Sequence, residues 1–191
     1  MGEIYRLPMP EPDRYLDEAF IPSAYRGFEA EWPASRVRME GRALVLTGPA
    51  GSGKSVAMAR MLTAWCEADR EQGEQQPSAL WLTAESMAQI GLHERVLMRA
   101  KTCALLAIDD LGRTYHRGGS DAGQSFGLHV LGSILGARMD YGLRLVATSN
   151  YSGLALRLRL GADAEEQARN WRRIDGDMSG AHVPVLAGVT G

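Results

Sequence analysis

The chain has 191 residues, of which 45% are hydrophobic and 23% are charged, and its formal net charge is −2. This composition suits one globular domain whose core needs no disulfides, and the near-neutral charge excludes a global attraction to nucleic acid or anionic lipid. Because there is no apolar leader and no run approaching the ~20 apolar residues of a membrane span, we expect a cytoplasmic protein without a membrane partner.

Residues 1–40 lean acidic, and the prolines around residues 9–12 favour extended chain or a turn. Several apolar residues here are too many for a free tail, so we expect them to pack on the domain: Phe20, Ile21, Tyr25, Phe28 and Trp32. A helix is predicted near residues 23–31. One aromatic ring could cover an adenine, although core packing is the simpler explanation. We assign residues 1–40 to a short N-terminal extension and residues 41–191 to the main domain.

Near the start of the main domain lies a glycine-rich run that fits G-x-x-x-x-G-K-[S/T]. It consists of Gly48, Pro49, Ala50, Gly51, Ser52, Gly53, Lys54 and Ser55. An apolar segment at residues 42–47 precedes it and a helical pattern at residues 55–66 follows it. Glycines in such a loop let backbone N–H groups surround an anion, and the helix N-terminus adds partial positive charge. Lys54 would then contact the β- and γ-phosphates of ATP, and Ser55 would hold Mg²⁺. The alternative, a glycine turn without a ligand, is disfavoured by the flanking strand and helix.

Beyond this loop, apolar strand-like runs alternate with helical patterns. After a polar loop at 67–78, strands are predicted at 79–83, 104–109, 143–148 and 182–186. Helices are predicted at 84–101 with an interruption at Gly91, at 124–141 after a charged loop at 112–123, and in the basic segment 153–173. Cys66 and Cys103 lack metal-ligand spacing and are expected to be buried thiols. The alternation predicts a parallel α/β sheet of the P-loop NTPase class with helices on both faces, which binds its ligand beyond the carboxyl ends of the strands.

Two further strands end in polar residues at that same edge. The run at 104–109 ends in Asp109 and is followed by Asp110, and Asn150 follows the strand at 143–148. Asp109 would bind Mg²⁺ directly or through water, and Asp110 would polarise an attacking water. Asn150 could orient that water and contact phosphate. The alternative is that the two acids only end a strand and begin a turn.

These motifs together resemble the AAA+ ATPase domain of the DnaC/IstB-like helicase loaders. The likeness rests on residues 48–55, on Leu-Leu-Ala-Ile-Asp-Asp-Leu-Gly at 105–112, on Thr-Ser-Asn at 148–150 and on Arg-Arg-Ile at 172–174, and it spans residues 40–187. It implies that residues 48–55 are Walker A, that Asp109 and Asp110 are Walker B and that Asn150 is sensor 1. A phage-type DNA replication protein is one form that such a chain could take.

The resemblance also implies an arginine finger that reaches the nucleotide of a neighbouring copy, and so a homo-oligomer formed on nucleotide or DNA. Arg173 matches best and Arg172 next; the alternative is an exposed helix arginine paired with an acid. Arg138 is a further candidate for an intersubunit or DNA contact. Two features depart from the family, because 40 residues are too few for a separate helicase-binding domain and no helical lid follows the last predicted strand.

The expected function is therefore an ATP-dependent loader that acts on a replicative helicase at single-stranded DNA. Two basic regions could contact the phosphate backbone of DNA, or form only a solvated surface. One is the loop that contains Arg113, His116 and Arg117, and the other is the segment between residues 138 and 173, which has seven arginines and four acids. Three alternatives stay open: an IstB-like ATPase that assists a transposase, a small-molecule P-loop kinase, and a nucleotide-gated adaptor with negligible turnover. The kinase is disfavoured because we find no lid segment.

Overall fold

The computed structural model describes residues 12–26, 41–90, 93–113, 121–151 and 153–175. At its centre is a parallel sheet with the strand order β1-β4-β3-β2, formed by β1 (Ala43–Thr47), β2 (Ala79–Thr83), β3 (Leu105–Asp109) and β4 (Arg144–Ser149). The predictions for these strands are confirmed to within a residue at each end. The strand predicted at 182–186 lies outside the described residues.

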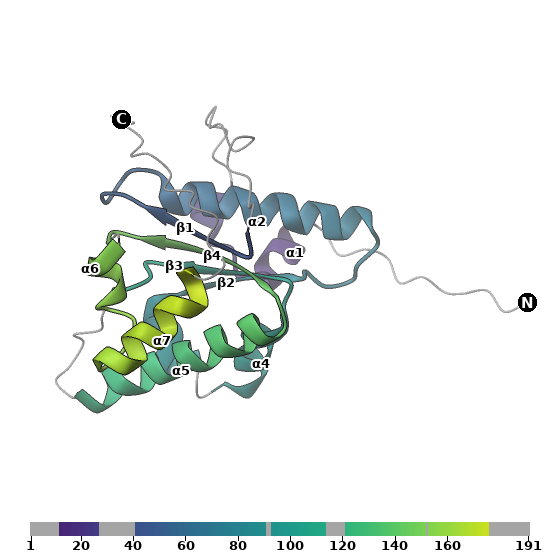
Figure 1. Cartoon of the computed structure of the whole chain (residues 1–191). Coiled ribbons are helices and arrows are strands. Elements are labelled where there is room, and N and C mark those ends of the chain that lie inside the picture. The colour runs from purple at the N-terminus through teal and green to yellow at the C-terminus, as the bar shows by residue number, and fades with distance from the viewer. Residues whose placement is uncertain (1–11, 27–40, 91–92, 114–120, 152, 176–191) are drawn as a thin grey trace, which may run out of the picture.

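Helices cover both faces of the sheet, as predicted (Figure 1). One face carries α2 (Lys54–Glu71), and the other carries α5 (Asp121–Asp140) with α7 (Ala164–Asp175) packed on it. The shorter elements are η3 (Ala84–Ser86), α3 (Met87–Ile90), α4 (Glu94–Thr102) and α6 (Gly153–Arg157). The predicted break at Gly91 falls outside the described residues, and the chain on either side of it belongs to two separate helices.

Two predicted loops are partly wrong. Residues 67–71 continue α2, and α5 already begins at Asp121 within the loop predicted at 112–123. The end of α2 is polar because it faces solvent, and its residues include good helix formers, so polarity there does not indicate a loop. Asp69 differs from the other polar residues at this end of α2, because it is nearly buried and accepts hydrogen bonds from the backbone N–H and the hydroxyl of Ser78.

Alternate strand residues divide the core into two layers. Toward α2, the sheet contributes Leu44, Leu46, Ala79, Trp81, Leu105, Ala107 and Val146. Toward α5, it contributes Ala43, Val45, Leu80, Leu82, Leu106, Ile108, Leu145 and Ala147. Strands that are apolar on both faces are typical of parallel sheets covered by helices, and they explain the continuous apolar runs in the sequence. The core thus holds the carboxyl ends of the strands in a fixed register.

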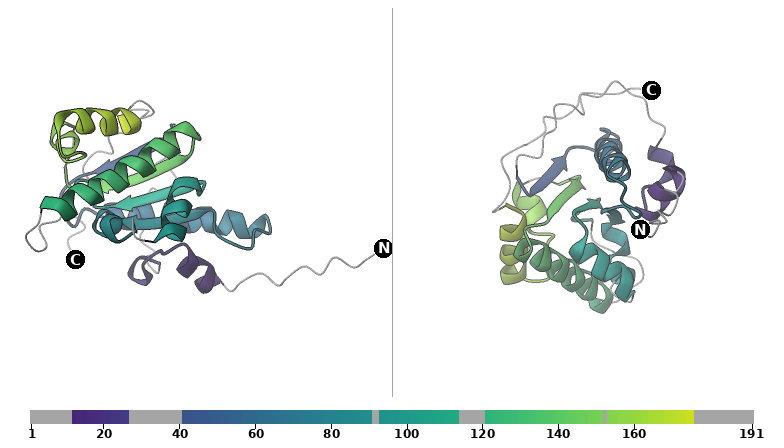
Figure 2. Two further views of the ribbon diagram at one scale, coloured as in Figure 1. Left: turned by 90° about the horizontal axis from the view of Figure 1, so that it is seen from below. Right: turned by 90° about the vertical axis from the view of Figure 1, so that its right-hand side faces the viewer.

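The N-terminal segment packs beside α2 through α1 (Pro12–Glu18) and η1 (Ser23–Tyr25), as Figure 2 shows. Ile21 is buried as expected, and the ring of Tyr25 contacts that of Trp81 with 5.7 Å between centroids. Phe20 differs from the expectation, because 47% of its surface is exposed and the guanidinium of Arg99 lies over its ring. Residues 27–31 of the helix predicted at 23–31 lie outside the described residues, as does Trp32.

Both cysteines are buried and free, as predicted. Burial raises the pKa of the Cys66 thiol to about 12, and the nearby charge of Asp69 adds to this increase. Burial also raises the pKa of Cys103, against the opposing charge of Arg138. Neither thiol is therefore activated as a nucleophile or metal ligand at neutral pH. Within the described residues, no helix is long and apolar enough to cross a membrane.

The expectation for Arg138 is wrong. Only 2% of this residue is exposed, and its guanidinium contacts the residues that precede or begin β3 and β4, so it is not available to DNA or another copy in this structure. It donates hydrogen bonds to the backbone carbonyls of Ala100, Cys103, Ala104 and Arg144. Burial lowers its pKa from the ordinary value. Arg138 thus connects the end of α4 to the beginnings of β3 and β4 through hydrogen bonds to backbone carbonyls.

Candidate functional site

The turn between β1 and α2 has the geometry of an anion-binding loop. Gly51 and Gly53 have φ angles of 77° and 83°, in the left-handed region that glycine adopts at little cost. Helix α2 begins at Lys54 without a side-chain cap, and its first turn contains no acidic residue. Backbone N–H groups and the positive end of the helix dipole are therefore available to an anion, which fits the phosphate binding predicted for residues 48–55.

The side chains of Ser55 and Asp109 meet at this loop. Ser55 Oγ donates a 2.8 Å hydrogen bond to Asp109 Oδ1, although the two residues are 54 positions apart. Thr148 Oγ1, at the end of β4, donates to the same carboxylate oxygen at 2.5 Å. Two hydroxyl groups from different elements therefore fix the orientation of Asp109.

A hydroxyl and a carboxylate in contact are suitable ligands for Mg²⁺. This ion usually keeps several waters and binds one or two carboxylates together with the phosphates of a substrate. Ser55 Oγ and Asp109 Oδ1 could supply the protein oxygens of such a site. In the part of the chain that the structure describes, no group of three or more His, Cys, Asp or Glu could hold a metal. The contact between Ser55 Oγ and Asp109 Oδ1 fits a metal that also binds the phosphates of a nucleotide.

Asp110 lies in a turn that is tied to the end of β4. Its φ angle of 57° is in the left-handed region, which is uncommon outside glycine although Asp adopts it more readily than most residues. The Asp110 N–H donates to Thr148 Oγ1 at 3.0 Å, and the Leu111 N–H donates to the Thr148 carbonyl at 2.7 Å. Ser149 Oγ donates to the Leu111 carbonyl at 2.7 Å. These bonds hold the Asp110 backbone, while its carboxylate accepts a hydrogen bond from Arg113 at 2.9 Å.

Lys54 connects the loop to Asn150. Its Nζ donates to the Pro49 carbonyl at 2.7 Å, to Asn150 Oδ1 at 3.1 Å and to Ser52 Oγ at 3.3 Å. Burial lowers the pKa of the Lys54 amine from its ordinary value, while the charges of Asp110 and Asp109 oppose this shift. The atoms that accept hydrogen bonds from Nζ are neutral, and a charged phosphate oxygen would be a stronger partner.

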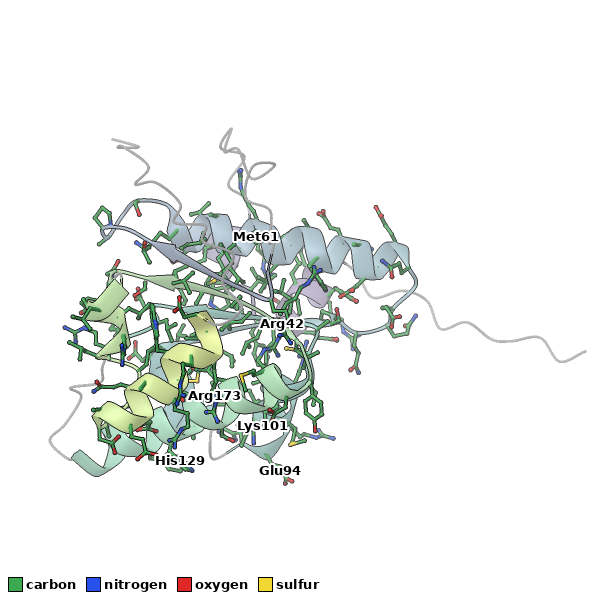
Figure 3. The ribbon with its side chains drawn as sticks, viewed as in Figure 1. Arg42, Met61, Glu94, Lys101, His129 and Arg173 are labelled. Carbon is green, nitrogen blue, oxygen red and sulfur yellow. The ribbon has the colours of Figure 1, made fainter. Side chains whose placement is uncertain are left out.

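The structure thus brings Lys54, Ser55, Asp109 and Asn150 together, with Asp110 in the turn beside them. The two arginines proposed as fingers lie elsewhere, on α7. Arg173 points toward α5 (Figure 3), donates to the Gly132 carbonyl at 2.8 Å, and is half-buried. Its pKa is lowered by burial first and by the charge of Arg169 next. Arg172 is exposed, and its Nε donates to the Ala168 carbonyl at 3.3 Å within the same helix. His116 and Arg117 lie outside the described residues.

Sequence reasoning did not assign roles to Thr148 and Ser149. Both are fully buried polar residues, and they connect the end of β4 to the two acids. The signal that could have identified them is a pair of hydroxyl residues at the end of an otherwise apolar strand, where a side-chain oxygen must find a partner. The sequence predicts only a possible DNA contact for Arg113 and does not indicate its ion pair with Asp110.

No protein-family model and no curated protein matches the chain. Among solved structures, it is similar to the crystal structure of DnaI, with a TM-score of 0.51 and 22% identity over 75% of this chain and 71% of that chain. It is also similar to a putative primosome component from Streptococcus pyogenes serotype M3, with a TM-score of 0.50 and 20% identity over 90% of this chain and 81% of that chain. A DNA replication initiation factor matches with a TM-score of 0.50 and 14% identity over 76% of this chain and 41% of that chain. These likenesses confirm the predicted fold, a parallel α/β sheet with helices on both faces.

Proposed function

We propose that the chain is an Mg²⁺-dependent ATPase that assembles with further copies and acts as a helicase loader in DNA replication. The observation that carries this proposal is the meeting of Lys54, Ser55, Asp109 and Asn150, which follow or end three neighbouring parallel strands. A phosphate-binding loop, a pair of metal ligands and a water-orienting amide are the parts that hydrolysis of a nucleoside triphosphate requires.

Each residue has a separate role in this proposal. Residues 48–53 and Lys54 bind the phosphates, while Ser55 and Asp109 hold the metal, which would neutralise phosphate charge when bound. Asp110 accepts a proton from the attacking water, and Asn150 orients that water. The fixed backbone of Asp110 supports its role, because a general base must be held within hydrogen-bond reach of its proton.

The trans-acting arginine remains part of the proposal, and the surroundings of the two candidates differ. The guanidinium of Arg173 already contacts Gly132 and Asn170 of its own chain, so reaching a neighbouring nucleotide would break these contacts. Arg172 is exposed on the outer side of α7, and its extension would break only one bond within the helix. We therefore favour Arg172 as the finger, with Arg173 holding α7 against α5.

The proposed partner is the replicative helicase. The similar structures include a putative primosome component and a replication initiation factor, which supports a role in replication more than one in transposition. Single-stranded DNA is the proposed template for assembly. Arg113 is exposed near the site and could contact a phosphate, whereas Arg138 is buried and could not.

Two assays test this function. The first measures ADP release from Mg²⁺-ATP by the purified chain, alone and with single-stranded DNA, and we expect hydrolysis that Lys54→Ala abolishes. Phosphate transfer to a nucleoside or sugar without ATP hydrolysis would instead indicate a kinase. The second is a pull-down from the native cell or phage-infected host. Recovery of the replicative helicase supports the loader, and recovery of a transposase supports the IstB-like alternative.

A further inference from the structure

Arg113 forms an ion pair with Asp110, a residue that we propose to be catalytic. Its Nη1 donates to Asp110 Oδ2 at 2.9 Å across a turn of three residues. The side chain of Arg113 is 64% exposed and that of Asp110 is 33% exposed. Because the pair faces solvent, it is weak enough to open and close without disturbing the fold.

The backbone of Asp110 is held in place, so it cannot follow a movement of Arg113. The residue has a left-handed φ angle of 57°, and its backbone N–H is bonded to the buried hydroxyl of Thr148. The next residue, Leu111, is fully buried and is bonded to the same threonine through its N–H. With the backbone held in this way, only rotation of the Asp110 side chain or departure of Arg113 can free the carboxylate.

The ion pair also affects the chemistry proposed for Asp110. A carboxylate that accepts the proton of an attacking water needs an oxygen that faces this water and keeps its negative charge. A guanidinium at 2.9 Å occupies one oxygen and offsets part of that charge. From this geometry we infer that Arg113 is a positioning residue that restrains Asp110 in the resting chain, and that hydrolysis requires Arg113 to leave it.

A second acid, Glu85, has a charge that acts on Arg113. Glu85 lies in η3, which directly follows β2, and the last residue of β2 is paired with Asp109 in the sheet register. Glu85 is exposed, and its charge acts on Arg113 together with that of Asp110, so that both acids raise the arginine pKa. Glu85 and Asp110 follow two neighbouring strands of the sheet, and movement of Arg113 toward Glu85 would release Asp110.

This inference rests on the proposed ATPase function, and steady-state hydrolysis tests it. We expect Arg113→Gln to raise the basal kcat by about twofold to fivefold, as loss of one exposed ion pair allows, with the KM for ATP unchanged. Arg113→Lys should stay near the wild-type rate. Salt should raise the wild-type rate relative to that of Arg113→Gln, because salt screens an exposed ion pair. Arg95→Gln, at an exposed arginine of α4, is the matched control and should change neither rate nor salt dependence.

A double-mutant cycle with Glu85 separates restraint from a merely structural role. Glu85→Gln should slow hydrolysis when Arg113 is present and have no effect in the Arg113→Gln chain. A rate for Arg113→Gln equal to or below wild type, with wild-type hydrolysis that depends on Lys54, would overturn the inference and leave the ATPase function intact. Absence of Lys54-dependent hydrolysis from the wild type would overturn both.

Discussion

Lys54 Nζ donates a 3.1 Å hydrogen bond to Asn150 Oδ1, between residues that are 96 positions apart in the sequence. The contact exists because β1 and β4 are neighbours in the sheet, with Thr47 opposite Ser149. The residues that follow these two strands are therefore held at one edge. A nucleotide that binds Lys54 must compete with Asn150 for the same ammonium group, so the loop at residues 48–53 and the side chain of Asn150 are expected to respond together to nucleotide.

The roles proposed for Asp109 and Asp110 can be separated by mutation. We expect Asp110→Asn to leave ATP binding unchanged and to slow hydrolysis by about 10²–10⁴, because a general base contributes to the transition state and not to binding. Equilibrium binding of a fluorescent ATP analogue and steady-state ADP release measure the two effects. Glu67→Gln, at an exposed acid of α2, is the control. Loss of binding by Asp110→Asn would contradict the assigned role.

Thr148 should affect both stability and metal-dependent binding. Thr148→Val keeps the side-chain shape but removes the hydroxyl that donates to Asp109 and accepts from the Asp110 N–H. We expect the free energy of unfolding to fall by about 1–3 kcal/mol, because the partly buried Asp110 N–H loses its acceptor. ATP affinity in Mg²⁺ should also fall. Urea denaturation and binding titrations measure these changes, and Thr148→Ser should restore most of both. Wild-type behaviour of Thr148→Val would remove its positioning role.

Arg138 should matter for folding and not for DNA binding. Arg138→Met is expected to lower the free energy of unfolding by about 3 kcal/mol, because several buried carbonyl groups lose their donor. Single-strand affinity, corrected for the folded fraction, should stay unchanged. Arg172→Ala is the exposed control and should change stability by less than about 0.5 kcal/mol. A stable Arg138→Met chain with weakened DNA binding would restore the original surface interpretation.

Mixed assemblies distinguish the two candidate finger arginines. A chain with Lys54→Ala cannot bind nucleotide but keeps its arginines, whereas a chain with Arg172→Ala keeps its nucleotide site. If Arg172 acts in trans, each variant alone should be inactive and their mixture should recover part of the hydrolysis rate. Arg173→Ala should instead lower the free energy of unfolding, because its contacts with Gly132 and Asn170 are lost. Recovery by mixing for Arg173→Ala, with Arg172→Ala fully active, would reverse this assignment.

The strands and the phosphate loop could be predicted because their signals are local. A continuous apolar run indicates a strand covered on both faces, and the glycines with Lys54 and Ser55 specify a strand–loop–helix unit within a few residues. The placement of Asp109, Asp110 and Asn150 at one edge of the sheet also followed from the sequence, since parallel strands end at one edge.

The remaining features depend on contacts between distant segments. The burial of Arg138 requires α5 to cross the beginnings of β3 and β4, which no local pattern indicates, so a charged residue was assigned to the surface. The contact of Arg173 with Gly132 depends on how α7 packs against α5. The extension of α2 through Glu71 was missed because a solvent-facing helix turn and a polar loop have similar composition.

The central claim is that nucleoside triphosphate with Mg²⁺ binds between Lys54, Ser55 and Asp109. Isothermal titration calorimetry of the folded chain with Mg²⁺-ATP tests it most directly, with Lys54→Ala of matched folding, verified by circular dichroism, as control. We expect saturable binding by the wild type, weaker binding when EDTA removes the metal, and no measurable binding by Lys54→Ala. A well-folded wild-type chain that binds no Mg²⁺-ATP, or a Lys54→Ala chain that binds it equally well, would contradict the account.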